Sequence, residues 1–307
     1  MSAPRHFLDI SDFDGATLRD IVDRAHAMKA AGRKPPPQFA PDQIEDMNLL
    51  MIFEKPSTRT RVSFDVAMRQ LGGGTISLNH GDLQLGRGES ISDTAKVLSR
   101  YGDAIMLRTK SHATLTELAE HATIPVINGL TDLSHPCQVV ADIMTLEENG
   151  GPVASRTVAW VGDGNNVANS WVHAAAKMSF RLRLACPPQL NLPAETIAWA
   201  RQHDADVAVT DDPREAVAGA DCVVTDTWVS MGQDDAARRK QMLGPYAVDR
   251  ALMAEAKSGA VFMHCLPAYR GHEVAADVID GPQSVVFDEA ENRLHAQKAI
   301  LSWCLGA

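Results

Sequence analysis

Short apolar runs alternate with stretches of helical periodicity along almost the whole chain. In its first half the apolar runs occupy residues 49–53, 75–78, 104–107 and 125–127. Helical patterns occupy residues 9–32, 58–71, 91–101 and 112–121, and a further one begins at Gln138 and ends at about Glu148. This alternation predicts a parallel sheet whose strands are joined by right-handed helical crossovers.

The sequence Asn149-Gly150-Gly151-Pro152 interrupts the pattern, and the alternation restarts beyond it. The second set of predicted strands comprises residues 157–161, 182–185, 207–209, 222–225, 261–264 and 285–287. We therefore predict an α/β chain of two doubly wound parallel-sheet domains, with the active site in the cleft between them. The predicted domains are residues 1–148 and 149–288, with a C-terminal helix of about residues 289–307 packing back on the first.

The composition is ordinary for a globular protein, with 45% hydrophobic and 22% charged residues in 307. A net charge of -10 without any basic run argues against a nucleic-acid surface. No apolar stretch approaches the roughly 18 residues of a membrane span, so we expect a cytoplasmic protein without a membrane partner. The five cysteines are scattered, which favours reduced thiols over disulfides or a zinc site.

The sequence Ser57-Thr58-Arg59-Thr60-Arg61 follows the first apolar run and opens a helix, with Val62 among the residues of its apolar side. Pro56 excludes helix before it, Ser57 or Thr58 can cap the helix, and Gly72-Gly73-Gly74 ends it. Backbone donors, hydroxyl groups, a positive dipole end and Arg59 together predict a site for a dianionic phosphate. The alternative is an ordinary helix start with two solvated arginines.

Polar residues that follow other strands of the same sheet are the next candidates, because ligands bind beyond the carboxyl ends of parallel strands. Arg108 follows the run 104–107, and His135 and Gln138 lie in the segment after 125–127. His135 stands beside Pro136 in a loop, where it can donate a hydrogen bond to an oxygen on which charge develops.

Two loops of the second half carry candidate polar groups. Residues 162–167, Gly-Asp-Gly-Asn-Asn-Val, resemble a dinucleotide fingerprint but have Val167 in the third glycine position, and no acidic residue follows the next strand. Asn166 could hold a carboxylate or serve only as a helix N-cap. Residues 226–232 offer the Asp226 carboxylate and a hydroxyl to an ammonium group, or form a solvated loop.

His264-Cys265-Leu266-Pro267 follows another strand, and Cys265 there is a nucleophile, a ligand or a small inert buried group. Arg293 opens the final helical region, where a solvated helix face is the alternative. Taken together, the candidates form an arginine-rich phosphate pocket and an amino-acid pocket. That combination suits transfer of an acyl-type group from a phosphate leaving group to an amine, without metal or cofactor.

These motifs resemble the aspartate/ornithine carbamoyltransferases. Residues 57–61, with Ser63-Phe64 after them, are similar to the family's carbamoyl-phosphate loop, and residues 135–138 to its second signature. Residues 226–232 and 264–267 resemble the ornithine branch, because the aspartate branch has proline in place of Cys265 and lacks the Ser-Met-Gly sequence.

The resemblance implies a homotrimer that transfers the carbamoyl group of carbamoyl phosphate to the δ-amine of L-ornithine. In it Arg59, Arg108 and His135 would stabilise the oxyanion, and Cys265 with Asp226 would influence deprotonation of the amine. The implied carbamoyl-phosphate contacts are Ser57, Thr58, Arg59, Thr60, Gln84, Arg108, His135, Gln138 and Arg293, with backbone at Cys265 and Leu266. The implied ornithine contacts are Asn166, Asp226, Ser230 and Met231.

Other functions stay open at this stage. A sister enzyme could use putrescine or N-acetylornithine, and a catalytically inactive regulator could keep only the phosphate pocket. A nicotinamide-linked dehydrogenase is disfavoured by Val167. The sequence leaves open the metabolic direction, any assembly beyond a trimer, the pH optimum and the group that accepts the amine proton.

Overall fold

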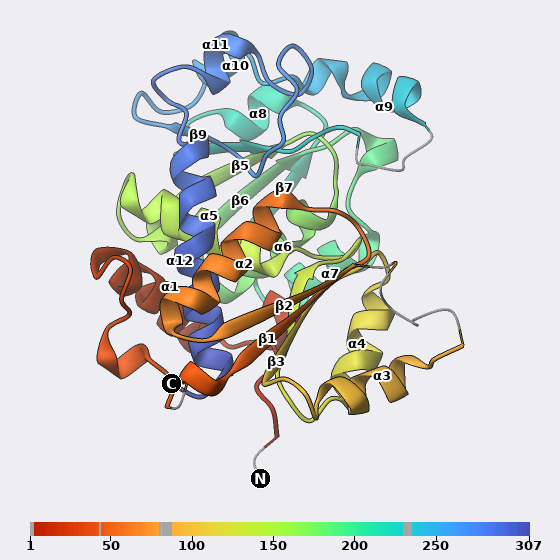
Figure 1. Cartoon of the computed structure of the whole chain (residues 1–307). Coiled ribbons are helices and arrows are strands. Elements are labelled where there is room, and N and C mark those ends of the chain that lie inside the picture. Colours follow the sequence, from red (N-terminus) through yellow and green to blue (C-terminus); the bar gives the residue numbers. More distant parts are fainter. Residues whose placement is uncertain (1–2, 43, 80, 82–87, 230–234) are drawn as a thin grey trace. The chain divides into compact units, whose positions relative to one another are not determined.

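The computed structural model describes residues 3–42, 44–79, 81, 88–229 and 235–307 (Figure 1). The chain divides into two compact units, of which unit 1 is Met1–Met144 with Glu291–Ala307 and unit 2 is Thr145–Ala290. Both divisions fall inside helices, namely α5 (Pro136–Glu148) and α12 (Val286–Cys304). The domain limits and the cleft drawn from sequence stay predictions.

Unit 1 contains a four-stranded, fully parallel sheet in the order β2-β1-β3-β4. Its strands are β1 (Asn48–Phe53), β2 (Gly74–Asn79), β3 (Ala104–Arg108) and β4 (Val126–Leu130). The four strands predicted for the first half are confirmed. The strand order reverses between β1 and β3, and a crevice at the carboxyl ends of such a pair is the usual ligand position.

Helices cover both faces of this sheet (Figure 1). They are α1 (Gly15–Ala30), α2 (Thr58–Leu71), α3 (Ile91–Leu98) and α4 (His112–His121), with short 3-10 turns at Ile10–Asp12, Pro37–Phe39 and Ile44–Asp46. Leu50 and Ile52 of β1 pack in one cluster with Ala95 of α3 and Leu115 of α4. Side chains alternate along a strand, so the buried Leu49 and Met51 point to the other face of the sheet, which α1 and α2 cover.

Helix α2 places the phosphate-loop residues at the carboxyl end of β1. Ser57, one of the two predicted candidates, is its N-cap, and Gly72, at φ +111°, is its C-cap as predicted. Its buried side includes Phe64, Ala67 and Met68, while Val62 is 54% exposed, so the prediction of Val62 on the apolar side was wrong. Val62 and Val66 are four residues apart, and this spacing alone did not show which of them faces the sheet.

Unit 2 contains a five-stranded parallel sheet in the order β7-β6-β5-β8-β9. The strands are β5 (Thr157–Val161), β6 (Arg181–Ala185), β7 (Val207–Thr210), β8 (Cys222–Thr225) and β9 (Val261–His264), which confirms five of the six predicted ones. The order reverses between β5 and β8. Residues 162–166 and Asp226, which follow those two strands, therefore lie at the switch point of this sheet.

The helices of unit 2 also cover both faces of its sheet. They are α6 (Asn166–Met178), α7 (Ala194–Gln202), α8 (Pro213–Val217), α9 (Ala236–Leu243), α10 (Arg250–Met253) and α11 (Ala276–Ile279), with 3-10 turns at Val153–Ser155, Pro188–Leu190 and Gly244–Tyr246. Residues of α8, α10 and α11 pack in one core cluster with Ala159, Val161 and Phe262 of the sheet. The large buried side chain Trp171 of α6 packs edge-on against Phe180.

The strand predicted at residues 285–287 is instead the start of a helix. Helix α12 begins at Val286, and an isolated bridge joins Ser284, just before it, to Phe262. Phe287 is 70% exposed, whereas a central strand would bury it, and Asp288 and Glu289 suit the positive end of a helix. A run of three apolar residues is too short to separate the two structures by periodicity.

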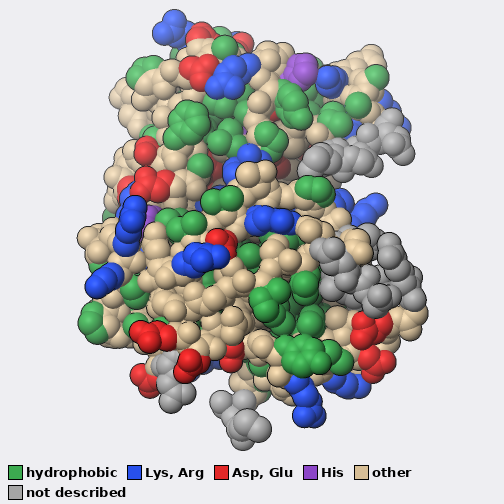
Figure 2. Space-filling view, viewed as in Figure 1, with side chains coloured by type: hydrophobic (Ala, Val, Ile, Leu, Met, Phe, Trp, Pro, Cys, Tyr) green, Lys and Arg blue, Asp and Glu red, His purple; other side chains and the backbone are tan. Residues whose placement is uncertain are grey.

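Within the described residues, no helix combines the length and apolar character needed to cross a bilayer. On the face drawn in Figure 2, Lys and Arg side chains are interspersed with Asp and Glu. Of the arginines of the candidate site, Arg293 is buried, with 4% exposed, and Arg59 and Arg108 are half-buried.

Candidate active site

The first turn of α2 holds two hydroxyl groups in contact. The Ser57 hydroxyl accepts from the Thr60 amide at 3.4 Å and donates to the Thr60 Oγ1 at 3.0 Å. Thr60 is fully buried, while Thr58 is exposed at the same turn. The N-terminus of the helix thus carries backbone donors, a positive dipole end and hydroxyl groups in one place.

Two arginines from distant parts of the chain donate to the same hydroxyl oxygen. Arg293 Nη2 lies 2.9 Å from Thr60 Oγ1, across 233 positions of sequence, and Arg108 Nη1 lies 3.4 Å from it. Arg108 ends β3 and Arg293 lies on α12 within unit 1. Thr60 is therefore the shared acceptor that orients two guanidinium groups at the N-terminus of α2.

Residues just after the strands hold Arg108 in place. The Glu54 amide donates to the Arg108 carbonyl at 2.9 Å, and the Thr109 hydroxyl donates to the Glu54 carboxylate. Thr109 is 1% exposed, so its end of this bond is buried. The carboxyl ends of β1 and β3 are thereby joined by side-chain as well as ladder contacts.

His135 lies in the same cationic cluster and is 3% exposed. Burial lowers the pKa of its ring well below the ordinary value of 6.5. The positive charges of Arg293, Arg108 and Arg59 lower that pKa further, in this order. The ring is therefore neutral at neutral pH and keeps one N–H donor and one acceptor nitrogen.

Gln138 lies three residues after His135, in the first turn of α5. Its backbone amide donates to the His135 carbonyl at 3.1 Å. It is fully buried, and its Nε2 donates to Asp142 Oδ1 at 2.8 Å. Burial raises the pKa of the neighbouring Cys137 thiol to about 12, so Cys137 is not a thiolate at neutral pH.

In unit 2 the Asp226 carboxylate is held by three donors. Asn165 Nδ2 donates to its Oδ2 at 2.7 Å, and the Thr227 amide donates to its Oδ1, also at 2.7 Å. The Cys265 thiol donates to the same Oδ1 at 3.1 Å. The predicted residues Asp226 and Cys265 thus form one cluster at the carboxyl ends of β8 and β9.

A tight turn follows Cys265. Leu266 has φ +56°, a left-handed conformation that costs free energy for a side chain of this size and often occurs at functional sites. Its amide donates to His264 Nδ1 at 2.8 Å, and the His264 amide donates to Glu289 Oε2 at 2.8 Å. Buried side chains of unit 2 therefore fix the backbone at Cys265 and Leu266.

Sequence reasoning missed Asn165, which is the N-cap of α6, whereas Asn166 is its first residue. Asn165 Oδ1 accepts from the Val167 and Ala168 amides at 2.9 and 3.1 Å while its Nδ2 reaches Asp226. The alternative considered for Asn166, an N-cap, is thus wrong by one position. Two adjacent asparagines could not be told apart by spacing.

Sequence reasoning also missed the ion pair of Arg239 and Asp163. Arg239 of α9 donates to the Asp163 carboxylate and, from Nε, to the Trp228 carbonyl at 2.8 Å. Burial raises the pKa of Asp163 to about 6 even though Arg239 opposes the shift. Gln84, Ser230 and Met231, which the resemblance assigned to the site, lie outside the described residues.

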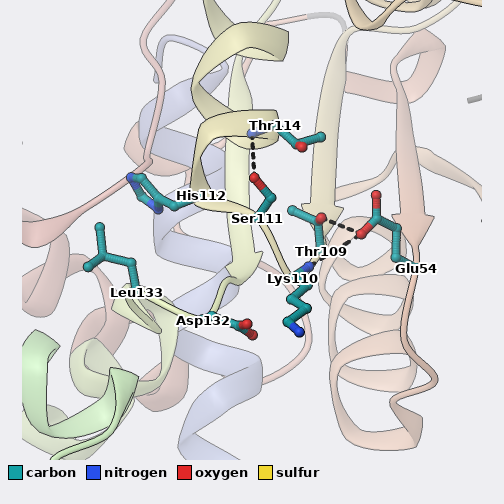
Figure 3. Close-up of a pocket in the computed structure, with 8 residues that line it drawn as sticks. All are labelled: Glu54, Thr109, Lys110, Ser111, His112, Thr114, Asp132 and Leu133. Carbon is teal, nitrogen blue, oxygen red and sulfur yellow. Dashed lines mark hydrogen bonds between the residues drawn. The ribbon is translucent and has the colours of Figure 1, made fainter. Parts of the chain in front are cut away.

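A cavity of about 540 Å³ lies in unit 1 (Figure 3). Its lining comes from the residues after β1, β3 and β4: Glu54, Thr109, Lys110, Ser111, His112, Thr114, Asp132 and Leu133. Figure 3 shows the Glu54 carboxylate turned toward Thr109 and Lys110. This lining includes none of the described residues that the family resemblance assigned to the two substrates.

One group in the described part of the chain has the composition of a metal site. Asp226, His264 and Cys265 each offer one ligand atom within 4.8 Å of the others. The Cys265 thiol donates to Asp226, however, and His264 Nδ1 accepts from the Leu266 amide. These internal hydrogen bonds give the three side chains a structural use without an ion.

Comparison with known proteins gives two family matches that together span nearly the whole chain. Residues 5–148 match the aspartate/ornithine carbamoyltransferase carbamoyl-P binding domain, and residues 154–304 match the Asp/Orn binding domain of the same family. The chain belongs to the aspartate/ornithine carbamoyltransferase family.

Individual members of this carbamoyltransferase family are similar over their full lengths. An ornithine carbamoyltransferase of Nitrobacter winogradskyi is 60% identical over 305 residues, which cover 99% of this chain and 98% of the relative. The ornithine carbamoyltransferase structure from Pyrococcus furiosus has 46% identity and a TM-score of 0.91, with 97% and 96% coverage. That from Burkholderia thailandensis has 45% identity and a TM-score of 0.88, with 98% and 99% coverage.

Proposed function

We propose that this protein is an ornithine carbamoyltransferase, which transfers the carbamoyl group of carbamoyl phosphate to the δ-amine of L-ornithine. The observation that carries the proposal is the cluster of Arg108 and Arg293 on Thr60, with His135 and Arg59 beside it, at the N-terminus of α2. This cluster belongs to the region that matches the carbamoyl-P binding domain. The full-length similarity to proteins named ornithine carbamoyltransferase supports the choice of acceptor.

Carbamoyl phosphate is a dianion with a planar carbamoyl end. In the proposal the first turn of α2 receives the phosphate through backbone amides and the Ser57 hydroxyl, since a helix N-terminus favours anions. Arg108 and Arg293 supply bidentate cations that match phosphate oxygens. The charge that binds the substrate also stabilises inorganic phosphate as it leaves.

We propose the following reaction. The neutral δ-nitrogen of ornithine attacks the carbonyl carbon, and the C=O π pair moves onto oxygen to give a tetrahedral oxyanion. Arg59, Arg108 and the neutral His135 ring donate to that oxygen, and one such donor is worth about 3–4 kcal/mol in the transition state. The oxyanion then collapses, the C–O bond to phosphate breaks, and the nitrogen loses one proton, giving citrulline and phosphate.

In the proposal Asp226 and Cys265 influence deprotonation of the ornithine amine, because the Asp226 carboxylate can accept a hydrogen bond from an ammonium group. A lysine-like amine has a reference pKa near 10.4, so it has to lose a proton before attack. The roles of Asn166, Gln138, Leu266 and the residues outside the described part remain part of the proposal. We also propose a cytoplasmic homotrimer, as the family resemblance implies.

An acceptor assay tests the proposal. The protein is given ¹⁴C-labelled carbamoyl phosphate with ornithine, putrescine, N-acetylornithine or aspartate, and the labelled products are separated. We expect kcat/KM for ornithine to exceed that for each other acceptor by at least about 100-fold, because a pocket built for polar groups rejects analogues that lack them. Preference for another amine would replace ornithine in the proposal, and absence of any product would favour a regulator.

A further inference from the structure

Asn165 makes one contact in unit 2 that its position at a helix start does not explain. Its Oδ1 accepts from the Val167 and Ala168 amides at 2.9 and 3.1 Å, which caps α6. Its Nδ2 donates to Asp226 Oδ2 at 2.7 Å. Capping needs only the oxygen, and serine or aspartate caps a helix about as well as asparagine does. The amide nitrogen therefore has a use of its own.

The start of α6 fixes which atom of the Asn165 amide faces Asp226. Backbone N–H groups only donate, so the side-chain atom that receives two of them has to be the oxygen. The nitrogen is then the other branch of the same planar amide, on the side of Asp226. Because this nitrogen only donates, Asp226 Oδ2 is the acceptor of the bond.

The hydrogen bonds of Asp226 use its two oxygens unequally. Oδ1 receives the Thr227 amide and the Cys265 thiol, whereas Oδ2 receives Asn165. A carboxylate offers about two lone pairs on each oxygen. The contacts of the described chain thus occupy both lone pairs of Oδ1 and leave one on Oδ2. Asp226 is 8% exposed, and a buried carboxylate is costly unless its oxygens are hydrogen-bonded, so a further donor at Oδ2 is favoured.

We propose that Asn165 is a positioning residue, which holds Asp226 Oδ2 so that the remaining lone pair of that oxygen faces the ornithine amine. The inference rests on the proposed function, in which Asp226 accepts a hydrogen bond from the amine, and deepens it. Thr227 and Cys265 both contact Oδ1, so these two bonds alone leave the carboxylate plane free to turn. The bond from Asn165 to the second oxygen fixes that plane.

Three substitutions of Asn165 separate the helix cap from the contact with Asp226. Asn165→Ser keeps a capping oxygen, but its side chain ends one bond short of the position of Nδ2. Asn165→Asp keeps the cap and the shape, and places an acceptor oxygen against Asp226 Oδ2. Asn165→Ala removes both the cap and the donor. Asp212→Ser is the control, because it exchanges the N-cap of another helix, α8, in the same unit.

Steady-state kinetics gives KM for both substrates, and urea unfolding gives the stability of each variant. We expect KM for ornithine to rise about 10- to 100-fold in Asn165→Ser and Asn165→Ala, the loss of one hydrogen bond to a charged group. Asn165→Asp should raise it by more than about 100-fold, because two acceptors then face each other.

The other two readouts should follow a different order. KM for carbamoyl phosphate should change by less than about threefold in all three variants, because most of its proposed contacts lie in unit 1. Stability should stay near that of the wild type in Asn165→Ser and Asn165→Asp and fall only in Asn165→Ala. Asp212→Ser should match the wild type in KM for both substrates. If Asn165→Asp does not fold, Asn165→Ser alone decides the question.

A KM for ornithine that follows stability, so that only Asn165→Ala is impaired, would overturn the inference, because Asn165 would then be a helix cap alone. An unchanged KM for ornithine in all three variants would overturn it as well. Citrulline formation by the wild type separates the two proposals. A wild type that makes no citrulline removes the proposed function, and the inference with it. Normal wild-type turnover with unaffected Asn165 variants removes the role of Asn165 alone.

Discussion

Stability should fall with decreasing pH because His135 is buried as a neutral ring among cations. Its folded-state pKa lies well below 6.5, lowered first by burial and then by Arg293, Arg108 and Arg59. In the unfolded chain the ring protonates with its ordinary pKa. Below pH 6.5 the unfolded state therefore binds more protons than the folded state, and the free energy of unfolding decreases as pH falls.

The size of the effect follows from the ordinary pKa of 6.5. At a pH above the lowered folded-state pKa, protonation of the ring in the unfolded chain lowers the free energy of unfolding by 2.303RT log(1 + 10^(6.5 − pH)), with 2.303RT about 1.36 kcal/mol. This expression gives about 0.1 kcal/mol at pH 7.5 and about 1.4 kcal/mol at pH 5.5. The His135 contribution between these pH values is therefore a loss of about 1.4 kcal/mol.

The loss in free energy of unfolding is measured by urea unfolding at pH 7.5 and 5.5, followed by circular dichroism, with His135→Gln as the test variant. Other groups titrate in this range, including Asp163 with a pKa raised to about 6, and they cancel when the two proteins are compared. The wild type should lose about 1.4 kcal/mol more than His135→Gln. His121→Gln, at the exposed C-terminus of α4, is the matched control and should follow the wild type. Equal losses in wild type and His135→Gln would refute the assignment of a buried neutral ring.

Two further substitutions test the packing of each unit. Thr60→Val keeps the side-chain shape but removes the acceptor for two guanidinium groups. The free energy of unfolding should therefore fall by about 2 kcal/mol, with exposed Thr58→Val as the control for stability, and KM for carbamoyl phosphate should rise. A Cβ at Gly164 would lie 2.5 Å from the Leu192 backbone nitrogen, so Gly164→Ala should lower the free energy of unfolding, measured with urea, by about 1–3 kcal/mol. Gly259→Ala is the control, because a Cβ there meets nothing within 4 Å, and it should leave the stability unchanged. A Gly164→Ala protein as stable as wild type would show that the two loops separate freely.

The sheets could be predicted from sequence because their strands read as short, mostly apolar runs, which are buried in the central strands and partly exposed in the edge strands β2 and β7. Nine such runs became strands, and the polar residues after them lie at the predicted edges. The run at 285–287 failed because three apolar residues also suit the first turn of a helix, and Phe287 is in fact exposed. Periodicity has no information over so short a stretch.

The site was predictable where one local motif carried it and less so where distant residues meet. Ser57 and Thr60 belong to one helix start, whereas Arg293 reaches Thr60 across 233 positions and was assigned only through the family resemblance. The choice between Asn165 and Asn166 depended on where a helix begins, which spacing does not fix to one residue. Likewise the i, i+4 spacing of Gln138 and Asp142 is visible in the sequence, but their burial is not.

The central claim is that the arginine cluster at the N-terminus of α2 binds carbamoyl phosphate and activates it. It is tested most directly by measuring carbamoyl-phosphate binding and citrulline formation in Arg59→Ala, beside Arg69→Ala, which removes the same charge from an exposed position of the same helix. We predict a fall of at least about 1,000-fold in kcat/KM and loss of measurable binding for Arg59→Ala, with an intact fold, and near wild-type values for Arg69→Ala. Activity of folded Arg59→Ala within about tenfold of wild type would contradict it.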